Sequence, residues 1–167
     1  ANPDLHLIET TSSPLIHLGM NLGYAPLAQP GVRKAIKYAL DYDGLKEFAL
    51  QGALVPQQTF IPPMLAGYNP AQPYQRDIAK AKALLVEAGY PEGFAVELKC
   101  LNFSPWTELV TQIQENLAEI GIQLNIVQIE VAQMVDEVWS AKKNSQMYLW
   151  EWGFDYPDPD SLAKPFA

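Results

Sequence analysis

The chain has 167 residues, of which 49% are hydrophobic, and carries a formal net charge of −8. A chain of this length and composition buries its own core and fits one domain or a large piece of a bigger protein. The acidic balance argues against a nucleic-acid partner, because phosphate backbones are held mainly by clustered lysine and arginine. No apolar run approaches the roughly 20 residues of a membrane-spanning helix, and the N-terminus lacks a secretory-signal layout. Either the protein is intracellular or a signal was removed.

The first half of the chain predicts one strand, two helices and a long irregular segment. Residues 15–22 are typical of a strand, and helical spacing of apolar residues begins at Val32 after a turn-rich stretch. Asp43 is placed to cap a second short helix that ends near Gly52. Five prolines in residues 53–74 predict an irregular excursion. Loops of that length are usually functional or wrapped over another part of the protein.

The second half alternates helices with strands. A helix is predicted from the N-cap Asp77 to Gly89, where a left-handed C-cap would fall. Residues 95–101 alternate like a strand, with Cys100 as a small core residue. A helix over 106–121 and a strand over 122–131 follow. This strand–helix–strand order predicts a βαβ unit with parallel strands.

A helix over residues 133–142 and a strand over 147–152 complete the pattern. We expect Val135, Val138 and Trp139 to face inward from that helix. The fold class is therefore α/β, with helices packed on a mixed or mostly parallel sheet.

Two loops are candidate ligand sites, because ligands in open α/β sheets bind beyond the carboxyl ends of the strands. One loop follows the strand at 95–101, and the other follows the strand at 147–152. The second joins an acid to aromatic rings, a combination that suits an organic ammonium through a charge-assisted hydrogen bond and cation–π contact. Asp155 is the first candidate. The ligand-binding residues expected in and beside these loops are Asn102, Phe103, Ser104, Trp152, Phe154, Asp155 and Tyr156.

Other features of the C-terminal stretch have simpler interpretations. Asp158 and Asp160 are expected to form a turn and cap a helix, and core packing accounts for two of Tyr148, Trp150 and Trp152. The spacing of the acids does not fit an EF-hand calcium loop.

Signatures of enzymes and cofactors are missing from the sequence. The two histidines lack zinc-ligand spacing, and the chain has neither a nucleophile elbow nor a phosphate-binding loop. We expect no catalytic residue, metal or cofactor. A hydrolase that uses paired carboxylates and an interaction module without a small ligand remain the alternatives to a binding protein.

Five stretches occur together in one order: LGMNLGYAPLAQPGVRKAIKYALDYDGL, FIPPMLAGYNP, DIAKAKALLVEAGYPEGF, IQENLAEIGIQLNI and MYLWEWGFDYPDPDS. Together they resemble the extracytoplasmic solute-binding proteins of peptide ABC transporters, family 5, which bind dipeptides and oligopeptides. The resemblance runs from about Leu18 to the end of the chain. It implies a periplasmic binding protein-like lobe of type II.

The resemblance also implies that residues 1–167 are a single α/β lobe, most of the C-terminal ligand-binding lobe of a longer two-lobe protein. Its partners would be a peptide or small amine-bearing solute, the missing N-terminal lobe and a membrane permease. The location would be periplasmic or extracytoplasmic, with lipid anchoring as an option and the signal peptide outside this chain.

In the family, the acid that matches Asp155 takes the α-ammonium group of the ligand, and the tryptophan that matches Trp152 borders the pocket. Family members that bind dipeptides carry an arginine near the loop that here reads LNFSPW and has no basic residue. This departure leaves longer peptides, or another amine-bearing solute, open.

Overall fold

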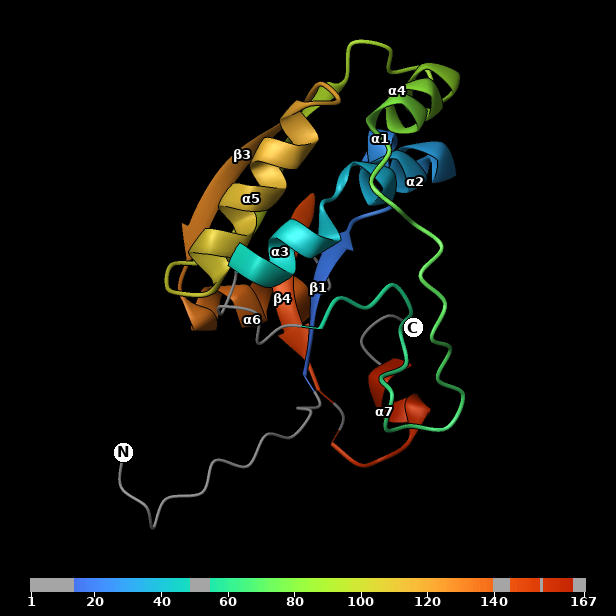
Figure 1. Ribbon diagram of the computed structural model, residues 1–167. Helices are drawn as coiled ribbons and strands as arrows, with labels where there is room; N and C mark the ends of the chain where they lie inside the picture. The colour runs from blue at the N-terminus through green and yellow to red at the C-terminus, as the bar shows by residue number, and fades with distance from the viewer. Residues whose placement is uncertain (1–13, 49–54, 140–144, 154, 164–167) are drawn as a thin grey trace, which may run out of the picture.

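The computed structural model describes residues 14–48, 55–139, 145–153 and 155–163. These residues form a four-stranded sheet flanked by helices (Figure 1). The strand order is β1-β4-β2-β3, with β2 parallel to both β3 and β4, and β1 antiparallel to β4. The predicted α/β class with a mixed, mostly parallel sheet is confirmed. The strands are β1 (Leu15–Met20), β2 (Phe94–Leu101), β3 (Ile122–Ile129) and β4 (Met147–Trp152).

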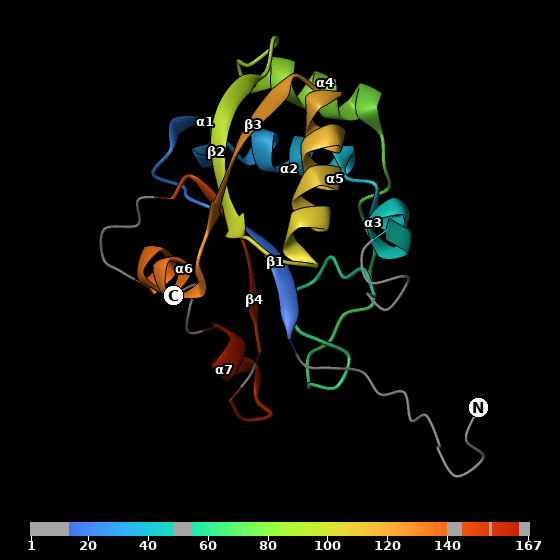
Figure 2. The same ribbon diagram turned by 90° about the vertical axis from the view of Figure 1, so that its left-hand side faces the viewer.

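The helices cover both faces of this sheet. Figure 2 shows α5 and α6 on opposite sides of the strands, and α4 packs on α2. An ion pair of 2.8 Å between Lys99 Nζ of β2 and Glu137 Oε1 ties α6 to its face. The helices are α1 (Ala25–Ala28), α2 (Pro30–Ala39), α3 (Tyr42–Phe48), α4 (Ile78–Glu87), α5 (Trp106–Ala118), α6 (Val131–Trp139) and α7 (Pro159–Ala163).

The main core lies between the sheet and helices α2 and α5. Alternate residues of β2 are buried, and the apolar stripe predicted for α5 is buried along its length. Each such side chain stabilises the fold by about 1.5–3 kcal/mol. Cys100 belongs to this core, as predicted, and burial raises the pKa of its thiol to about 11. The buried core residues of β2 and of the α5 stripe are Val96, Leu98, Cys100, Leu101, Trp106, Val110, Ile113, Leu117 and Ile120.

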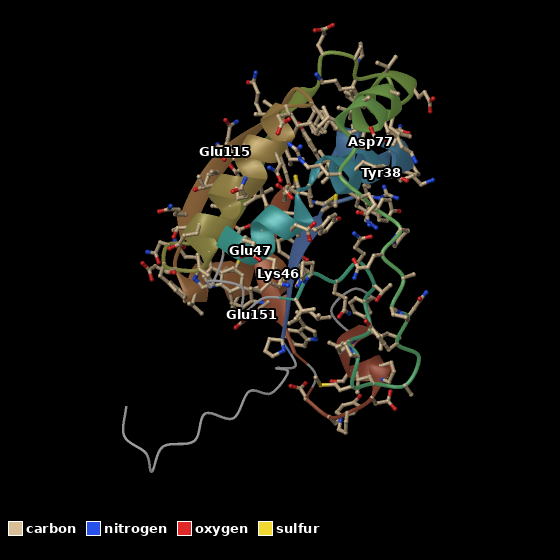
Figure 3. The ribbon with its side chains drawn as sticks, in the orientation of Figure 1. Tyr38, Lys46, Glu47, Asp77, Glu115 and Glu151 are labelled. Carbon is tan, nitrogen blue, oxygen red and sulfur yellow. The ribbon has the colours of Figure 1, made fainter. Side chains whose placement is uncertain are left out.

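Helix α4 begins and ends where the sequence predicts. The Asp77 side chain accepts a hydrogen bond of 2.9 Å from the Lys80 backbone N–H, and Gly89 has a φ of 89°. The Asp77 N–H also donates to the Tyr38 carbonyl at 2.8 Å, and Figure 3 shows these two residues where α2 meets the start of α4. The cap therefore also docks α4 onto α2.

Two predicted details of the helices are wrong. Asp41, not Asp43, caps α3, because its Oδ1 lies 3.0 Å from the Gly44 N–H while Asp43 already lies in the first turn. On α6, Val135 is 43% exposed and Met134 is buried in its place. The helix begins earlier than predicted, and its face with Met134 packs inward, on the same side as Glu137, which pairs with Lys99 of β2.

Three other sequence predictions fall at the margins of the described residues. Val138 does pack against the core, as predicted. The Trp139 side chain, residues 140–144 and residues 49–54 around Gly52 lie outside the described part of the chain. The turn-rich stretch after β1 contains the short helix α1, which was not predicted.

Residues 55–74 contain no helix or strand, which confirms the predicted excursion. In Figure 1 this segment reaches the end of the molecule where α7 lies and then returns to α4. Glutamine side chains replace the missing ladder bonds: Gln58 donates to the Tyr74 carbonyl at 2.6 Å and accepts from the Tyr74 N–H at 2.7 Å. Gln57 bonds two further carbonyls of the same segment. These side chains therefore satisfy backbone groups of the excursion that have no partner in a helix or strand.

Candidate ligand-binding site

The carboxyl ends of the three parallel strands meet at one edge of the sheet. Asn102 follows β2 and Glu130 follows β3, and Asn102 Nδ2 donates to Glu130 Oε1 at 2.7 Å. The pairing of Lys99 with Tyr148 aligns β4 with β2. From this pair β2 continues to Leu101 and β4 to Trp152, so the loop after β4 begins farther along the strand direction than the loop after β2. Both predicted loops therefore follow the carboxyl ends of parallel strands, and the Asp155 loop extends beyond the Asn102 loop.

Asp155 lies in the loop that connects β4 to α7. Its side chain is exposed, and its backbone N–H donates to the hydroxyl of Ser161 at 2.8 Å. No lysine or arginine among the described residues forms an ion pair with it. Within that part of the chain, the carboxylate is not neutralised by a basic side chain. The predicted site residue Phe154 lies outside the described residues.

Two aromatic rings accompany this acid. Trp152 ends β4 with a half-buried indole, whose Nε1–H donates to the Ser161 carbonyl at 3.3 Å. Tyr156 is 41% exposed, and its hydroxyl donates to Asp160 at 3.0 Å. The loop therefore presents an acid between two aromatic residues whose polar atoms are already engaged within the lobe. Such a surface can bind an organic cation by charge and by ring contact.

Asp158 shapes the turn before α7, as predicted. Its Oδ1 accepts from the Asp160 N–H at 2.9 Å, and its carbonyl accepts from the Ser161 N–H. Asp160 lies in the first turn of α7, and its carboxylate accepts the hydrogen bond from the Tyr156 hydroxyl. The carboxylates of Asp158 and Asp160 both accept hydrogen bonds within this turn. The Asp155 carboxylate forms no ion pair among the described residues.

The other aromatic residues of β4 serve packing, as predicted. Trp150 stacks on Trp106 with ring centroids 6.3 Å apart, and both Trp150 and Tyr148 pack against the core.

The loop after β2 contributes mainly apolar surface. Phe103 is 46% exposed, and Asn102 is held by Glu130. Hydrogen bonds lower the pKa of Glu108: first from the Thr107 hydroxyl, then from its own backbone and from the Ser104 hydroxyl. Ser104 therefore points its hydroxyl to α5.

Sequence reasoning missed two side chains at this edge, Glu130 and Ser161. Glu130 directly follows a strand, so the rule that selected Asn102 could also have found it. Ser161 carried no such signal, because its role depends on a contact between α7 and the loop.

A cavity of about 850 Å³ adjoins Trp152. It lies between β1, α2, α3 and the excursion, and most of its lining is apolar. Lys46 of α3 and Glu151 of β4, both labelled in Figure 3, border it. The Trp152 side chain therefore also lines a mostly apolar cavity, which the sequence did not predict.

The described ranges contain neither a metal-binding cluster nor a membrane-spanning helix. No group of three or more histidine, cysteine, aspartate or glutamate side chains there could hold a metal ion. None of the helices observed there has the length and hydrophobicity needed to cross a bilayer.

Solved structures share this architecture. The chain superimposes on the periplasmic binding protein DppA of Helicobacter pylori, in complex with the peptide STSA, with a TM-score of 0.84 and 28% identity. That match covers 92% of this chain and 30% of the other. For a dipeptide-binding protein of Pseudoalteromonas sp. SM9913 in complex with Met-Leu, the TM-score is 0.85 at 25% identity, over 93% and 31% of the two chains. The fold is that of the type II periplasmic binding proteins.

The model of the bacterial extracellular solute-binding proteins, family 5 Middle, matches residues 1–167. The glutathione-binding protein GsiB of Salmonella choleraesuis (strain SC-B67) is 32% identical over 168 aligned positions, which are 98% of this chain and 33% of that protein. The chain therefore belongs to family 5 of the bacterial extracellular solute-binding proteins. It spans about a third of the length of the relatives that it matches.

Proposed function

We propose that residues 1–167 form most of the C-terminal lobe of a longer two-lobe protein that binds a peptide or another amine-bearing solute between its lobes. The relatives support this reading, because they are described as binding glutathione, the peptide STSA or Met-Leu. Each of these relatives is about three times as long as this chain, so the second lobe would lie outside residues 1–167. Closure of two lobes around the solute would complete the site.

The observation that carries the proposal is the exposed carboxylate of Asp155. Asp155 follows Trp152 by three residues, in the loop beyond the carboxyl end of β4, and no basic side chain of the described residues pairs with it. An α-ammonium group would gain a charge-assisted hydrogen bond from the acid and cation–π contact from the ring. Asn102, Phe103 and Ser104, with Tyr156 and Phe154, would border the same ligand.

The loop after β2 favours a ligand longer than a dipeptide. Residues 102–105 contain no lysine or arginine that could meet a nearby C-terminal carboxylate. A longer peptide carries this charge farther from Asp155, where the second lobe can receive it. The peptide STSA bound by the Helicobacter relative has this length.

The family membership places the protein among extracellular solute-binding proteins. We propose a periplasmic or lipid-anchored location and delivery of the solute to an ABC permease in the membrane. Its contribution is binding, with no catalytic step.

Calorimetric titration of the full-length protein with Ser-Thr-Ser-Ala tests the site. Asp155→Asn should weaken binding by about 2–5 kcal/mol, the cost of leaving an enclosed ammonium without its counter-charge. The N-acetylated peptide should bind the wild-type protein equally poorly, because it carries no ammonium group. Glu87→Gln makes the same charge change at the end of α4, at the far end of the lobe from α7 (Figure 1), and should leave affinity unchanged. Equal affinity of wild type and Asp155→Asn would refute the assignment.

A further inference from the structure

Ser161 connects α7 to both functional groups of the proposed site. Its hydroxyl oxygen accepts the backbone N–H of Asp155 at 2.8 Å, and its carbonyl oxygen accepts the indole N–H of Trp152 at 3.3 Å. The residue itself is only 1% exposed. One buried residue therefore holds both the acid and the ring.

Other bonds hold the residues after Asp155 to α7: the Tyr156 hydroxyl donates to Asp160, and the Ser161 N–H donates to the Asp158 carbonyl. Each residue from Asp155 to Asp158 is exposed. The backbone hydrogen bond nearest to Asp155 joins Asp158 N–H to the Tyr156 carbonyl, inside the loop itself. That bond shapes the turn but does not fix it to the lobe. Among the described residues, the bond from the Asp155 N–H to the Ser161 hydroxyl ties the acid's own backbone to a buried residue.

We propose that Ser161 is a positioning residue, which sets the direction of the Asp155 carboxylate relative to the Trp152 ring before a ligand arrives. This inference rests on the proposed function of Asp155. A loop that is already ordered spares the ligand the entropy cost of ordering it, so affinity depends on the anchor as well as on the acid. Ser161 touches no ligand in this account and acts through its two neighbours.

The variant Ser161→Ala removes the hydroxyl acceptor and keeps the carbonyl. Amide hydrogen exchange of the intact protein without ligand should then show Asp155 exchanging about tenfold faster, because its N–H has lost its partner. In titrations with Ser-Thr-Ser-Ala, affinity should fall about threefold to tenfold, the range of one hydrogen bond. Ser145→Ala is the matched control. Ser145 is also buried and hydrogen-bonded, but it lies before β4 and binds Glu137.

A double-mutant cycle separates positioning from a general structural effect. In the Asp155→Asn background, Ser161→Ala should change affinity by less than twofold, because the carboxylate that it positions is gone. An equal loss in both backgrounds, or the same loss in Ser145→Ala, would overturn the positioning role. Unchanged exchange at Asp155 would overturn it as well.

The two proposals can fail separately. If Asp155→Asn binds the peptide as wild type does, the proposed function fails, while the exchange measurement still decides whether Ser161 holds the loop. If Asp155→Asn weakens binding but Ser161→Ala changes neither exchange nor affinity, only the positioning role fails.

Discussion

A contact between two glycines should control the stability of the βαβ unit. Gly93, before β2, has a φ of 74°, and Gly121, before β3, has a φ of 83°. A Cβ on Gly93 would lie 2.0 Å from the Gly121 carbonyl oxygen, which as a backbone atom cannot rotate away. The same contact places the starts of both strands side by side, and Asn102 and Glu130 directly follow the ends of these strands. Gly93→Ala should therefore disturb the fold and the edge of the proposed site together.

The expected cost has two parts. A left-handed backbone costs a non-glycine residue about 1–2 kcal/mol, and forcing atoms into a filled space costs about 1–3 kcal/mol more. Gly89 offers a matched control, because its φ is 89° and a Cβ there meets nothing within 4 Å. Gly89→Ala should show the first part alone. The gain from restricting the unfolded chain is similar in both variants and cancels in the difference.

Urea denaturation of the full-length protein, followed by tryptophan fluorescence, gives the free energy of unfolding of each variant. Gly93→Ala should be destabilised by about 1–3 kcal/mol more than Gly89→Ala. Equal destabilisation of the two variants would show that the close approach of the strand starts contributes nothing. The reasoning from the Cβ distance would then be refuted.

Two further predictions concern stability. The ion pair with Lys99 and, to a smaller extent, the hydrogen bond from Ser145 lower the pKa of Glu137, so its stabilisation is present at neutral pH and is lost as pH falls through the lowered value. Glu137→Gln should cost about 1–2 kcal/mol at neutral pH and less in acid, and urea unfolding over a pH series should show the two curves converging. A constant gap at every pH would contradict this origin. Asp77→Ala should cost about 1 kcal/mol through the lost cap to the Lys80 N–H, whereas Asp77→Asn should cost less. Thermal unfolding measures both variants, and equal losses would exclude capping as the cause.

The predictions about α6 and α3 show where local pattern is insufficient. Apolar spacing on α6 could not distinguish Met134 from Val135 as the inward residue, because two neighbouring apolar residues fit the stripe of one helix face almost equally well. In the folded lobe Met134 is fully buried, and Glu137 on the same side of α6 pairs with Lys99 of β2. Similarly, both Asp41 and Asp43 are suitable capping residues, and only the residue at which α3 begins decides that Asp41 accepts the Gly44 N–H.

Some residues of the candidate site could be named from the sequence, whereas the contacts between them could not. Asp155, Trp152 and the loop after β2 were accessible from the sequence, because a strand end followed by an acid and rings is a local pattern. The bond between Asn102 and Glu130, the cavity beside Trp152 and the two bonds of Ser161 depend on segments that meet only in the folded lobe.

Local sequence was enough for the α/β class, the βαβ unit, the limits of α4 and the capping role of Asp158. These features depend on hydrophobic periodicity and on residues that bond their near neighbours, so a short stretch of chain contains the whole interaction. The tertiary structure decided which side of α6 meets the sheet, the order β1-β4-β2-β3 and the seating of the Asp155 loop on Ser161. These depend on contacts between distant parts of the chain, whose energies are settled only when the core has packed.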